Sequence, residues 1–256
     1  MRRTPARRAG PQGGSAMSHV VQQIIRDDPR FHSGGVNCWS ALPGILGVLS
    51  AHATSDTQSA ETGCGASTVV FAAAGGRHTA ISPDPREHQL VREYCEKIGV
   101  DHSGVTFIAE SSDEVLPSLY DGRVLDFAFI DGAHSFPYAI IDWHYITSAL
   151  KLHGKVLVDD IAIHAITPLY HFMAAEDWWR LESIPDDRAA LFALAELPPE
   201  EGYTTQQFNR HMDYSFAPPV MRARLVAADT GTRARREAGR RLPWARELWQ
   251  RRHGGR

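Results

Sequence analysis

The stretch LDFAFIDGAH, residues 125–134, contains an apolar run that stops abruptly at an acid. The mainly apolar residues 125–130 are typical of a strand that is buried on both faces of a parallel sheet. Asp131, Gly132 and then His134 follow. Turn formation accounts for the glycine, but not for an acid and a histidine placed together. The stretch therefore indicates a central strand and a possible site at its carboxyl end.

Similar apolar runs recur along the chain and alternate with helical patterns. Besides a strand that ends at Glu61, we expect strands at 78–82, 105–110, 125–131 and 155–160. Helices are expected at 18–32, 36–52, 67–74, 85–98, 112–120, 136–151 and 164–175. The alternation predicts an α/β fold with a Rossmann-like, doubly wound parallel sheet. Two further runs, 178–184 and 188–197, are separated by PDD and predict an antiparallel hairpin at the sheet edge.

Bulk properties narrow the class of protein. The chain has 256 residues, 43% of them hydrophobic, and contains no apolar run near the roughly 18 residues that a membrane span needs. Its basic N-terminus lacks the apolar segment of a secretory signal. Three cysteines, an odd number at wide spacing, argue against a disulfide scaffold and for a reducing compartment. We therefore expect a cytoplasmic protein that makes no membrane contact.

Basic residues gather at the two ends of the chain. Residues 1–16 carry four Arg and no acid, and residues 233–256 carry nine Arg and two Glu. Such ends can bind nucleic acid or anionic lipid, but no aromatic residues are interleaved in a folded module, so solvated and partly disordered ends are favoured. We expect a disordered tail at 1–17 with Met17 as an alternative start, a helical lid at 18–56, the α/β domain at 57–220 and a basic extension at 221–256.

Acids occur at the carboxyl ends of nearly all of the expected strands. They are Glu61, Glu110, Asp131, Asp159 and Asp160, with Asp84 close behind the strand that ends at Ser82. Open α/β sheets bind ligands beyond these ends. Several acids on one rim are costly to keep ionised unless something positive lies among them. The pattern favours a cation or a ligand with several hydroxyl groups.

The stretch ETGCGAST, residues 61–68, is a glycine-rich turn between the first strand and its helix. Gly63 and Gly65 allow the backbone to turn sharply and to approach a ligand. A dinucleotide fingerprint would have a third glycine where Thr68 stands, and the carboxylate of Glu61 would repel a pyrophosphate. The turn suits a ligand that carries an amine and a ribose, and the alternative is a purely structural turn.

Three segments together, ETGCGAST, FIDGAHSFPYAIIDW and LKLHGKVLVDDI, resemble class I S-adenosylmethionine-dependent methyltransferases. The closer resemblance is to a bacterial, Methyltransf_24-like branch with an F-I-D-G-x-H motif and a following D-D, related to small-molecule O-methyltransferases. It covers roughly residues 57–195. It implies a seven-stranded sheet that ends in an antiparallel hairpin, with helices on both faces.

The resemblance also implies which residues hold the cofactor S-adenosylmethionine. The glycine turn lies under its methionine part, Glu110 and Ser111 lie near the adenine, and the end of the second strand meets the ribose. Asp84 stands two residues beyond that strand, which departs from the family pattern. The residues implied in cofactor binding are Glu61, Gly63, Gly65, Ser67, Ser82, Asp84, Glu110, Ser111 and Asp131.

Asp131, Asp159 and Asp160 follow two strands that we expect to be neighbours, which would bring their carboxylates together. Carboxylates with an open face suit Mg²⁺, and in metal-dependent relatives acids at these positions hold the ion. The alternative is that Asp160 caps the next helix and that Asp131 serves only its turn.

His134 is the candidate general base, acting beside Asp131, because an imidazole accepts protons near neutral pH. The resemblance assigns the same role to this position. The alternative is a histidine that caps a helix or supports a neighbour, and His164 is a second candidate base.

The sequence thus predicts Mg²⁺-assisted O-methylation of a hydroxylated small molecule, such as a sugar or another natural product. The alternatives are metal-independent N- or O-methylation and a binding protein that keeps the fold without catalysis. A homo-oligomer and a monomer both stay open, and nucleic acid is not an expected partner.

Overall fold

The computed structural model describes residues 13–32, 41–198, 206–210 and 212–241. The chain forms two compact units, Met1–Gly202 and Tyr203–Arg256, which are treated separately below. The domain limits expected from the sequence, at residues 17, 56 and 220, stay predictions.

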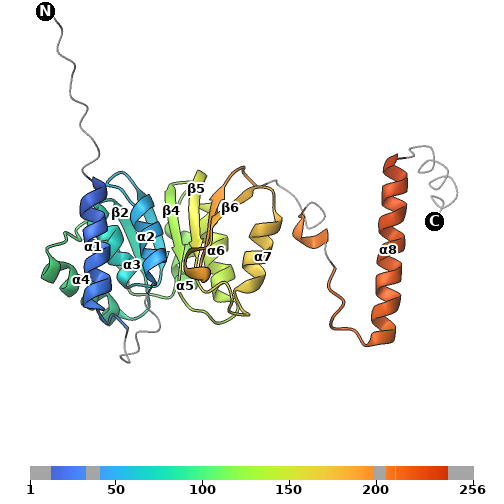
Figure 1. The fold of residues 1–256 in the computed structure, drawn as a ribbon, viewed down its shortest axis with the longest axis horizontal. Coiled ribbons are helices and arrows are strands. Elements are labelled where there is room, and N and C mark those ends of the chain that lie inside the picture. The colour runs from blue at the N-terminus through green and yellow to red at the C-terminus, as the bar shows by residue number, and fades with distance from the viewer. Residues whose placement is uncertain (1–12, 33–40, 199–205, 211, 242–256) are drawn as a thin grey trace, which may run out of the picture. The chain divides into compact units, whose positions relative to one another are not determined.

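The first unit is built on one seven-stranded sheet (Figure 1). Its strands are β1 (Gln58–Thr62), β2 (Arg77–Ile81), β3 (Val105–Ile108), β4 (Leu125–Ile130), β5 (Leu150–Val158), β6 (Trp179–Ser183) and β7 (Ala190–Leu194). They lie in the order β3-β2-β1-β4-β5-β7-β6. Strands β1 to β5 pair in parallel, whereas β7 runs antiparallel to both β5 and β6. The predicted Rossmann-like sheet with an antiparallel hairpin is confirmed.

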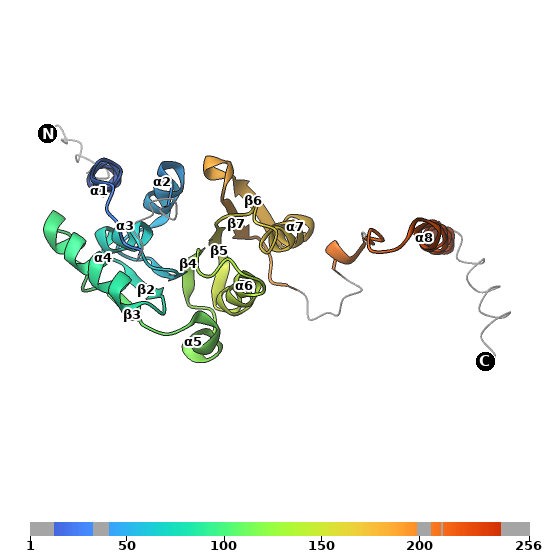
Figure 2. The same ribbon diagram turned by 90° about the horizontal axis from the view of Figure 1, so that it is seen from below.

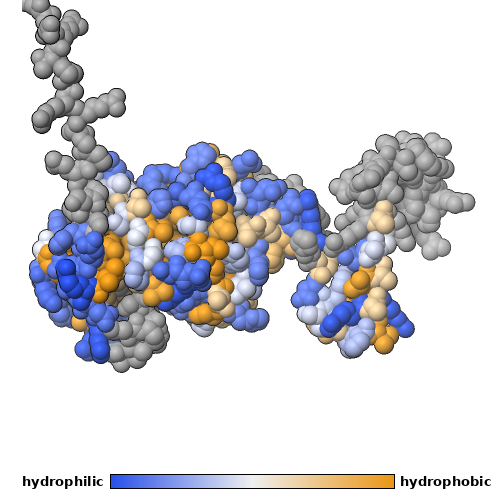
Figure 3. All heavy atoms as spheres, viewed as in Figure 1, coloured by the Kyte–Doolittle hydropathy of each residue, from blue (hydrophilic) through white to orange (hydrophobic). Residues whose placement is uncertain are grey.

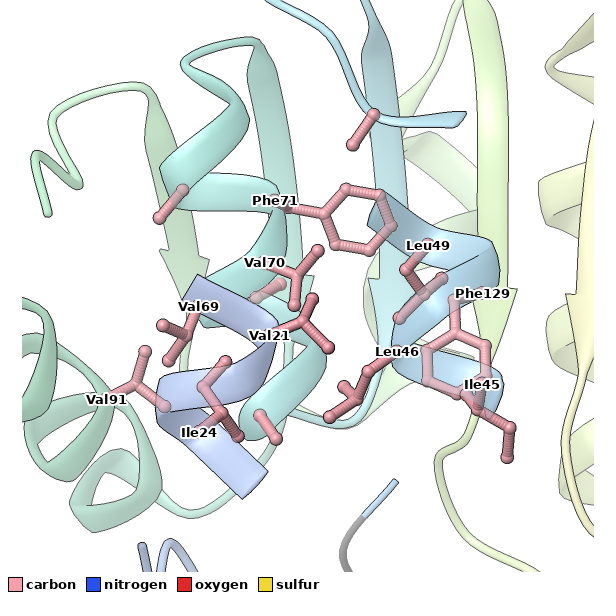
Figure 4. Close-up of a cluster of buried hydrophobic side chains, with 14 of the residues drawn as sticks. Val21, Ile24, Ile45, Leu46, Leu49, Val69, Val70, Phe71, Val91 and Phe129 are labelled. Carbon is pink, nitrogen blue, oxygen red and sulfur yellow. The ribbon is translucent and has the colours of Figure 1, made fainter. Parts of the chain in front are cut away.

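Helices cover both faces of this sheet (Figure 2). They are α1 (Gly13–Asp27), α2 (Pro43–His52), α3 (Ala66–Ala74), α4 (Pro85–Ile98), α5 (Ser112–Leu119), α6 (Tyr138–Ser148) and α7 (Thr167–Ala175). Side chains alternate along β4, so Phe127 and Phe129 face the core under α1 to α4. Ala128 and Ile130 face the second core, under α5 to α7. Figure 4 shows the first core, where α1, α2 and α3 pack around Phe71 and Leu46.

Local sequence sets the ends of helix α4, which follows β2. The carboxylate of Asp84 accepts a hydrogen bond from the Arg86 backbone N–H at 2.9 Å, and Pro85 occupies the first helical position. Gly99 ends the helix in the left-handed conformation with φ 73°. Asp84 is therefore engaged as a helix cap.

The order of strands reverses between β1 and β4, which are neighbours. Thr62 is paired with Ile130 at their carboxyl ends, so the glycine turn after β1 and the FIDGAH segment after β4 begin side by side. A reversal of this kind opens a crevice in which α/β proteins bind ligands.

Strand β7 sets how the predicted hairpin joins the sheet. The hairpin forms the sheet edge, as predicted, with β7 between β5 and β6. Val158 of β5 is paired with Ala190 of β7, so the residues just before β7 lie beside those just after β5. This register decides which side chains meet at the rim.

Strand β5 spans residues 150–158 instead of the expected 155–160. The strand begins earlier because Leu150 already pairs with Leu125. His153, with φ 67°, lies in the irregular part of the strand, which is why the start was not predicted. Its end at Val158 leaves Asp159 and Asp160 in the loop beyond the strand. Helix α6, at 138–148, is correspondingly shorter than the expected 136–151.

The second unit contains a short turn, η3 (Phe208–Arg210), and helix α8 (Pro219–Arg241). Helix α8 includes the part of the expected basic end, 233–256, up to Arg241, and the rest of that end lies outside the described residues. Proline at the first position and many Ala and Arg residues favour this helix. Exposed apolar side chains, among them Val220 and Val226, lie among hydrophilic ones on α8 (Figure 3). No helix within the described residues is both long enough and apolar enough to cross a bilayer.

Candidate active site

The glycine turn brings the ends of three strands together. Gly63 has φ +98°, a value that favours glycine, and its N–H donates to the Ile81 carbonyl at 2.8 Å. A Cβ at Gly63 would lie 2.5 Å from the Asp131 carbonyl oxygen. Only glycine therefore lets the turn after β1 pass this close to the turn after β4.

Glu61 lies at the end of β1 and is fully buried. Its Oε1 accepts hydrogen bonds from the Thr68 hydroxyl and, at 3.0 Å, from Nε2 of His78. The Gly65 N–H in turn donates to Thr68 Oγ1 at 3.0 Å. Thr68, which stands where a dinucleotide fingerprint has its third glycine, thus ties the turn to the acid. Glu61 Oε2 is buried and has no hydrogen-bond partner among the described residues.

The end of β2 presents an acid that the sequence interpretation missed. Glu87, on the first turn of α4, accepts a hydrogen bond from the Ser82 hydroxyl at 2.6 Å and lies 2.8 Å from Nδ1 of His32. His32 borders Gly65, since a Cβ there would lie 3.6 Å from its Nε2. Glu87 therefore lies at the rim beside the glycine turn, where Asp84 was expected. Its place in the first turn of a helix that follows the strand was the available signal.

The remaining cofactor candidates are arranged around the same rim. Ser67 is buried in the first turn of α3, and Glu110 is exposed after β3. The Ser111 hydroxyl donates to Asp113, its neighbour in the first turn of α5. The structure places these residues at the predicted strand ends, with Ser111 already engaged.

Asp131, His134 and Asp160 form a compact group, here named the acid–histidine cluster. Nε2 of His134 lies 3.4 Å from Asp131 Oδ1 and 3.5 Å from Asp160 Oδ2. One ligand atom from each residue lies within 4.8 Å of the others, which is compatible with a shared metal ion. His164, the second candidate base, is exposed and lies outside this group.

Asp159 and Asp160 meet a side chain that the sequence interpretation did not select, Arg188. Its Nε lies 2.9 Å from Asp160 Oδ1, and its Nη2 donates to Asp160 Oδ2 at 3.1 Å. The same Nη2 lies 3.0 Å from Asp159 Oδ2, and Asp159 is fully buried. Arg188 supplies a positive charge at the acidic rim, so it meets the electrostatic requirement inferred from the sequence.

The surroundings shift the pKa values of residues in the cluster and of the neighbouring Asp159. Burial raises the pKa of Asp131 to about 7, although the neighbouring His134 opposes the rise. Burial also raises the pKa of Asp159, against the effect of Arg188. The pKa of His134 is raised because Asp131 favours the charged imidazole, an effect that outweighs partial burial. The pKa values of two acids and of the histidine are thus displaced from their ordinary values, as is common at sites of acid–base chemistry.

Fold and rim together define a class of protein. A sheet with this strand order, a glycine turn after β1 and acids after β4 and β5 is that of the class I S-adenosylmethionine-dependent methyltransferases, as the sequence resemblance implied. Residues 60–161 match the Methyltransf_24 family model, described as a methyltransferase domain. The recognition is confirmed: the chain carries an S-adenosylmethionine-dependent methyltransferase domain.

Solved structures share this fold at low sequence identity. A putative caffeoyl-CoA O-methyltransferase from Staphylococcus aureus has a TM-score of 0.53 at 12% identity, over 70% of this chain and 92% of that one. A methyltransferase from Geobacter sulfurreducens has a TM-score of 0.52 at 14% identity, over 75% and 92%. The O-methyltransferase TomG from Streptomyces achromogenes, involved in tomaymycin synthesis and solved in complex with SAM, has a TM-score of 0.50 at 15% identity, over 73% and 92%. No curated protein matches the sequence.

Proposed function

We propose that this protein transfers a methyl group from S-adenosylmethionine to a hydroxyl of a small molecule, with His134 as the general base. The observation that carries the proposal is the acid–histidine cluster, which lies at the strand reversal directly beside the glycine turn. Cofactor loop and proton acceptor thus share one rim, as a transfer between two bound molecules requires.

The described residues fit the cofactor in charge and shape. Glu61 Oε2, buried and without a hydrogen-bond partner among the described residues, suits an ammonium group. Gly63 and Gly65 let a ligand approach the backbone closely. We propose Glu87 with Ser82 as the acceptor pair for the ribose hydroxyls, while Asp84 acts through its cap on α4. Ser67, Glu110 and Ser111 complete the proposed contacts.

When bound, S-adenosylmethionine supplies a methyl group activated by a sulfonium centre. His134 takes the acceptor's hydroxyl proton at Nε2, and the acceptor oxygen forms the new bond to carbon while the electron pair of the broken carbon–sulfur bond stays on sulfur. Asp131 and Asp160, each within 3.5 Å of that nitrogen, stabilise the imidazolium that results. The raised pKa of His134 reflects the same stabilisation.

We propose that Mg²⁺ binds at the same cluster, where it would bind and polarise the acceptor hydroxyl. Mg²⁺ prefers oxygen ligands, so Asp131 and Asp160 would hold it and leave Nε2 of His134 for the proton. Asp159, the third residue expected from the sequence, has its Oδ2 next to Arg188.

A second candidate is transfer without a metal, and the position of Arg188 favours it. The guanidinium already balances Asp159 and Asp160. Turnover that is unchanged in EDTA would select this second candidate, and turnover that is lost in EDTA and restored by Mg²⁺ would select the first.

We propose a natural product, including a sugar, as the acceptor. The support is limited to the resemblance and to shared folds, of which one belongs to an O-methyltransferase involved in tomaymycin synthesis. A screen of hydroxylated acceptors for a mass increase of one methyl group identifies the substrate, and the reaction is expected in the cytoplasm.

The test of the base is His134→Gln in the full chain, with His144→Gln as the matched control, because His144 is exposed on α6. Turnover should fall by about 100-fold or more in His134→Gln, while the Kd for S-adenosylmethionine stays unchanged by calorimetry. In the wild type, kcat should rise with pH through a pKa above 6.5, the ordinary histidine value. A wild-type rate in His134→Gln would remove this residue as the base.

A further inference from the structure

We propose that Arg188 is a built-in competitor of the divalent cation and sets the metal affinity of the acid–histidine cluster. The inference rests on the metal part of the proposed function and concerns a residue that lies 28 positions after Asp160 in the chain. In this inference, the guanidinium of Arg188 controls how tightly the rim binds a metal ion.

The geometry places Arg188 on an oxygen pair that a metal would use. Its Nη2 donates to Asp160 Oδ2 at 3.1 Å, and its Nε lies 2.9 Å from Asp160 Oδ1, so the guanidinium contacts both carboxylate oxygens. Asp160 is also one of the three residues of the cluster. A cation that binds there must therefore share Asp160 with the guanidinium or displace it.

Charge strengthens this competition. A divalent ion that approaches Asp160 meets the positive charge of Arg188, and like charges a few ångströms apart repel strongly where water is largely excluded. The side chains of Arg188 and Asp160 are only 19% and 20% exposed, and Asp159 is fully buried. The repulsion is thus only weakly screened by solvent.

Arg188 is also held in place by its backbone. Its N–H donates to the Pro185 carbonyl at 3.1 Å, and its carbonyl accepts from the Ile161 N–H at 3.0 Å. Strand β7 begins two residues later and is paired with β5. The guanidinium is therefore presented to the two acids by a fixed segment, which lowers the entropy cost of keeping it there.

A contact with helix α2 fixes the same segment from the other side. Asp186 Oδ2 accepts a hydrogen bond from the Ile45 N–H at 2.8 Å, in the first turn of α2. A Cβ on Gly44 would lie 2.6 Å from Asp186 Oδ1. Helix α2 and the segment that carries Arg188 thus pack closely, and a side chain at residue 44 would disturb both.

The test is direct titration of the full chain with Mn²⁺, chosen because its binding can be followed by calorimetry and by electron paramagnetic resonance. Arg188→Gln should bind Mn²⁺ at least tenfold more tightly than the wild type, because both Asp159 and Asp160 are freed. Arg180→Gln is the matched control: Arg180 pairs with Glu182 at the outer strand and is 66% exposed, so its affinity should equal that of the wild type.

Arg188→Lys guards against loss of folding in the glutamine variant, because lysine keeps the charge but has only one nitrogen to contact the two oxygens of Asp160. Its affinity for Mn²⁺ should lie between those of the wild type and Arg188→Gln. Circular dichroism checks the fold of each variant. Affinity in a folded Arg188→Gln or Arg188→Lys variant that is no higher than in the wild type would overturn the inference. Methyl transfer is measured separately, so its absence would count against the proposed function and not against the inference about Arg188.

Discussion

At the residue scale, Glu87 and Asp84 have separate contacts, although the sequence interpretation had selected only Asp84 for the cofactor. Asp84 caps α4 through the Arg86 N–H, whereas Glu87 contacts Ser82 and His32 beside the glycine turn. A short distance along the chain thus separates an acid that holds a helix from an acid that faces the rim.

Glu87→Gln and Asp84→Ala should therefore have different effects. We expect Glu87→Gln to weaken S-adenosylmethionine binding by about tenfold, the effect of losing a charge-assisted hydrogen bond of 1.5 kcal/mol or so, with little change in Tm. Asp84→Ala should cost about 1 kcal/mol of stability through the lost cap and leave binding close to that of the wild type. Calorimetry and thermal unfolding separate the two effects, and equal binding losses in both variants would contradict the division.

Asp131 illustrates the conflict between function and stability. Burial raises its pKa from 3.8 to about 7. Between these values the folded state binds more protons than the unfolded state, so its contribution to stability decreases as the pH rises from about 4 to 7. Asp131→Asn has no such titration. Its Tm should be close to that of the wild type near pH 4 and exceed it at pH 8 by about 10 °C.

Thermal unfolding of both proteins at the two pH values checks this prediction. The variant is expected to lose turnover while it gains stability at pH 8. An equal Tm for the two proteins at pH 8 would show that the Asp131 carboxylate is not destabilised in the fold.

At the scale of single elements, two glycines should respond in opposite ways to the same change. Gly63→Ala places a Cβ 2.5 Å from the Asp131 carbonyl in a backbone with φ +98°, so we expect a loss of about 1–3 kcal/mol and loss of cofactor binding. Gly47 lies exposed within α2, and its Cβ would meet nothing within 4 Å. Gly47→Ala should therefore stabilise the protein by about 0.5–1 kcal/mol. Denaturant unfolding measures the free energy of unfolding of both variants, and a change of the same sign in both would refute the argument.

Strands such as β4 could be predicted because they are short apolar runs with a clear end. The β2 run was expected at 78–82 and lies at 77–81, and α4 was expected at 85–98 and lies there. The pattern carries this information because burial on both faces of a parallel strand demands apolar residues. The predicted rim residues Asp131, His134 and Asp160 were also brought together.

Arg188 could not be predicted in the same way, because no local pattern marks it. It reaches Asp160 only through the pairing of β7 with β5, where Val158 meets Ala190. That register depends on the insertion of β7 between β5 and β6, which follows from packing of the whole sheet. The irregular start of β5 was not predicted for a similar reason, since the irregularity in its pairing with β4 has no sequence signal of its own.

At the scale of the whole molecule, the methyltransferase fold has its own two cores within the first unit. Both clusters of buried apolar side chains draw their members from residues up to Leu194. We expect a chain that ends at residue 202 to keep the Tm and the cofactor Kd of the full chain within error. Thermal unfolding and calorimetry on the shortened chain check this. A Tm lower by more than about 4 °C, roughly 1 kcal/mol, would show that residues 203–256 stabilise the fold.

The late position of β7 in the chain has a consequence for synthesis. Strands emerge from the ribosome in chain order, and the edge of β5 stays unpaired until residues 190–194 arrive, because β6 does not touch it. Such an edge can pair with another chain. The same late segment carries Arg188 to Asp159 and Asp160. Insertion of one strand therefore covers the exposed edge of β5 and brings a positive charge to the acidic rim in a single step, and before this step the newly made chain can pair with another chain through that edge.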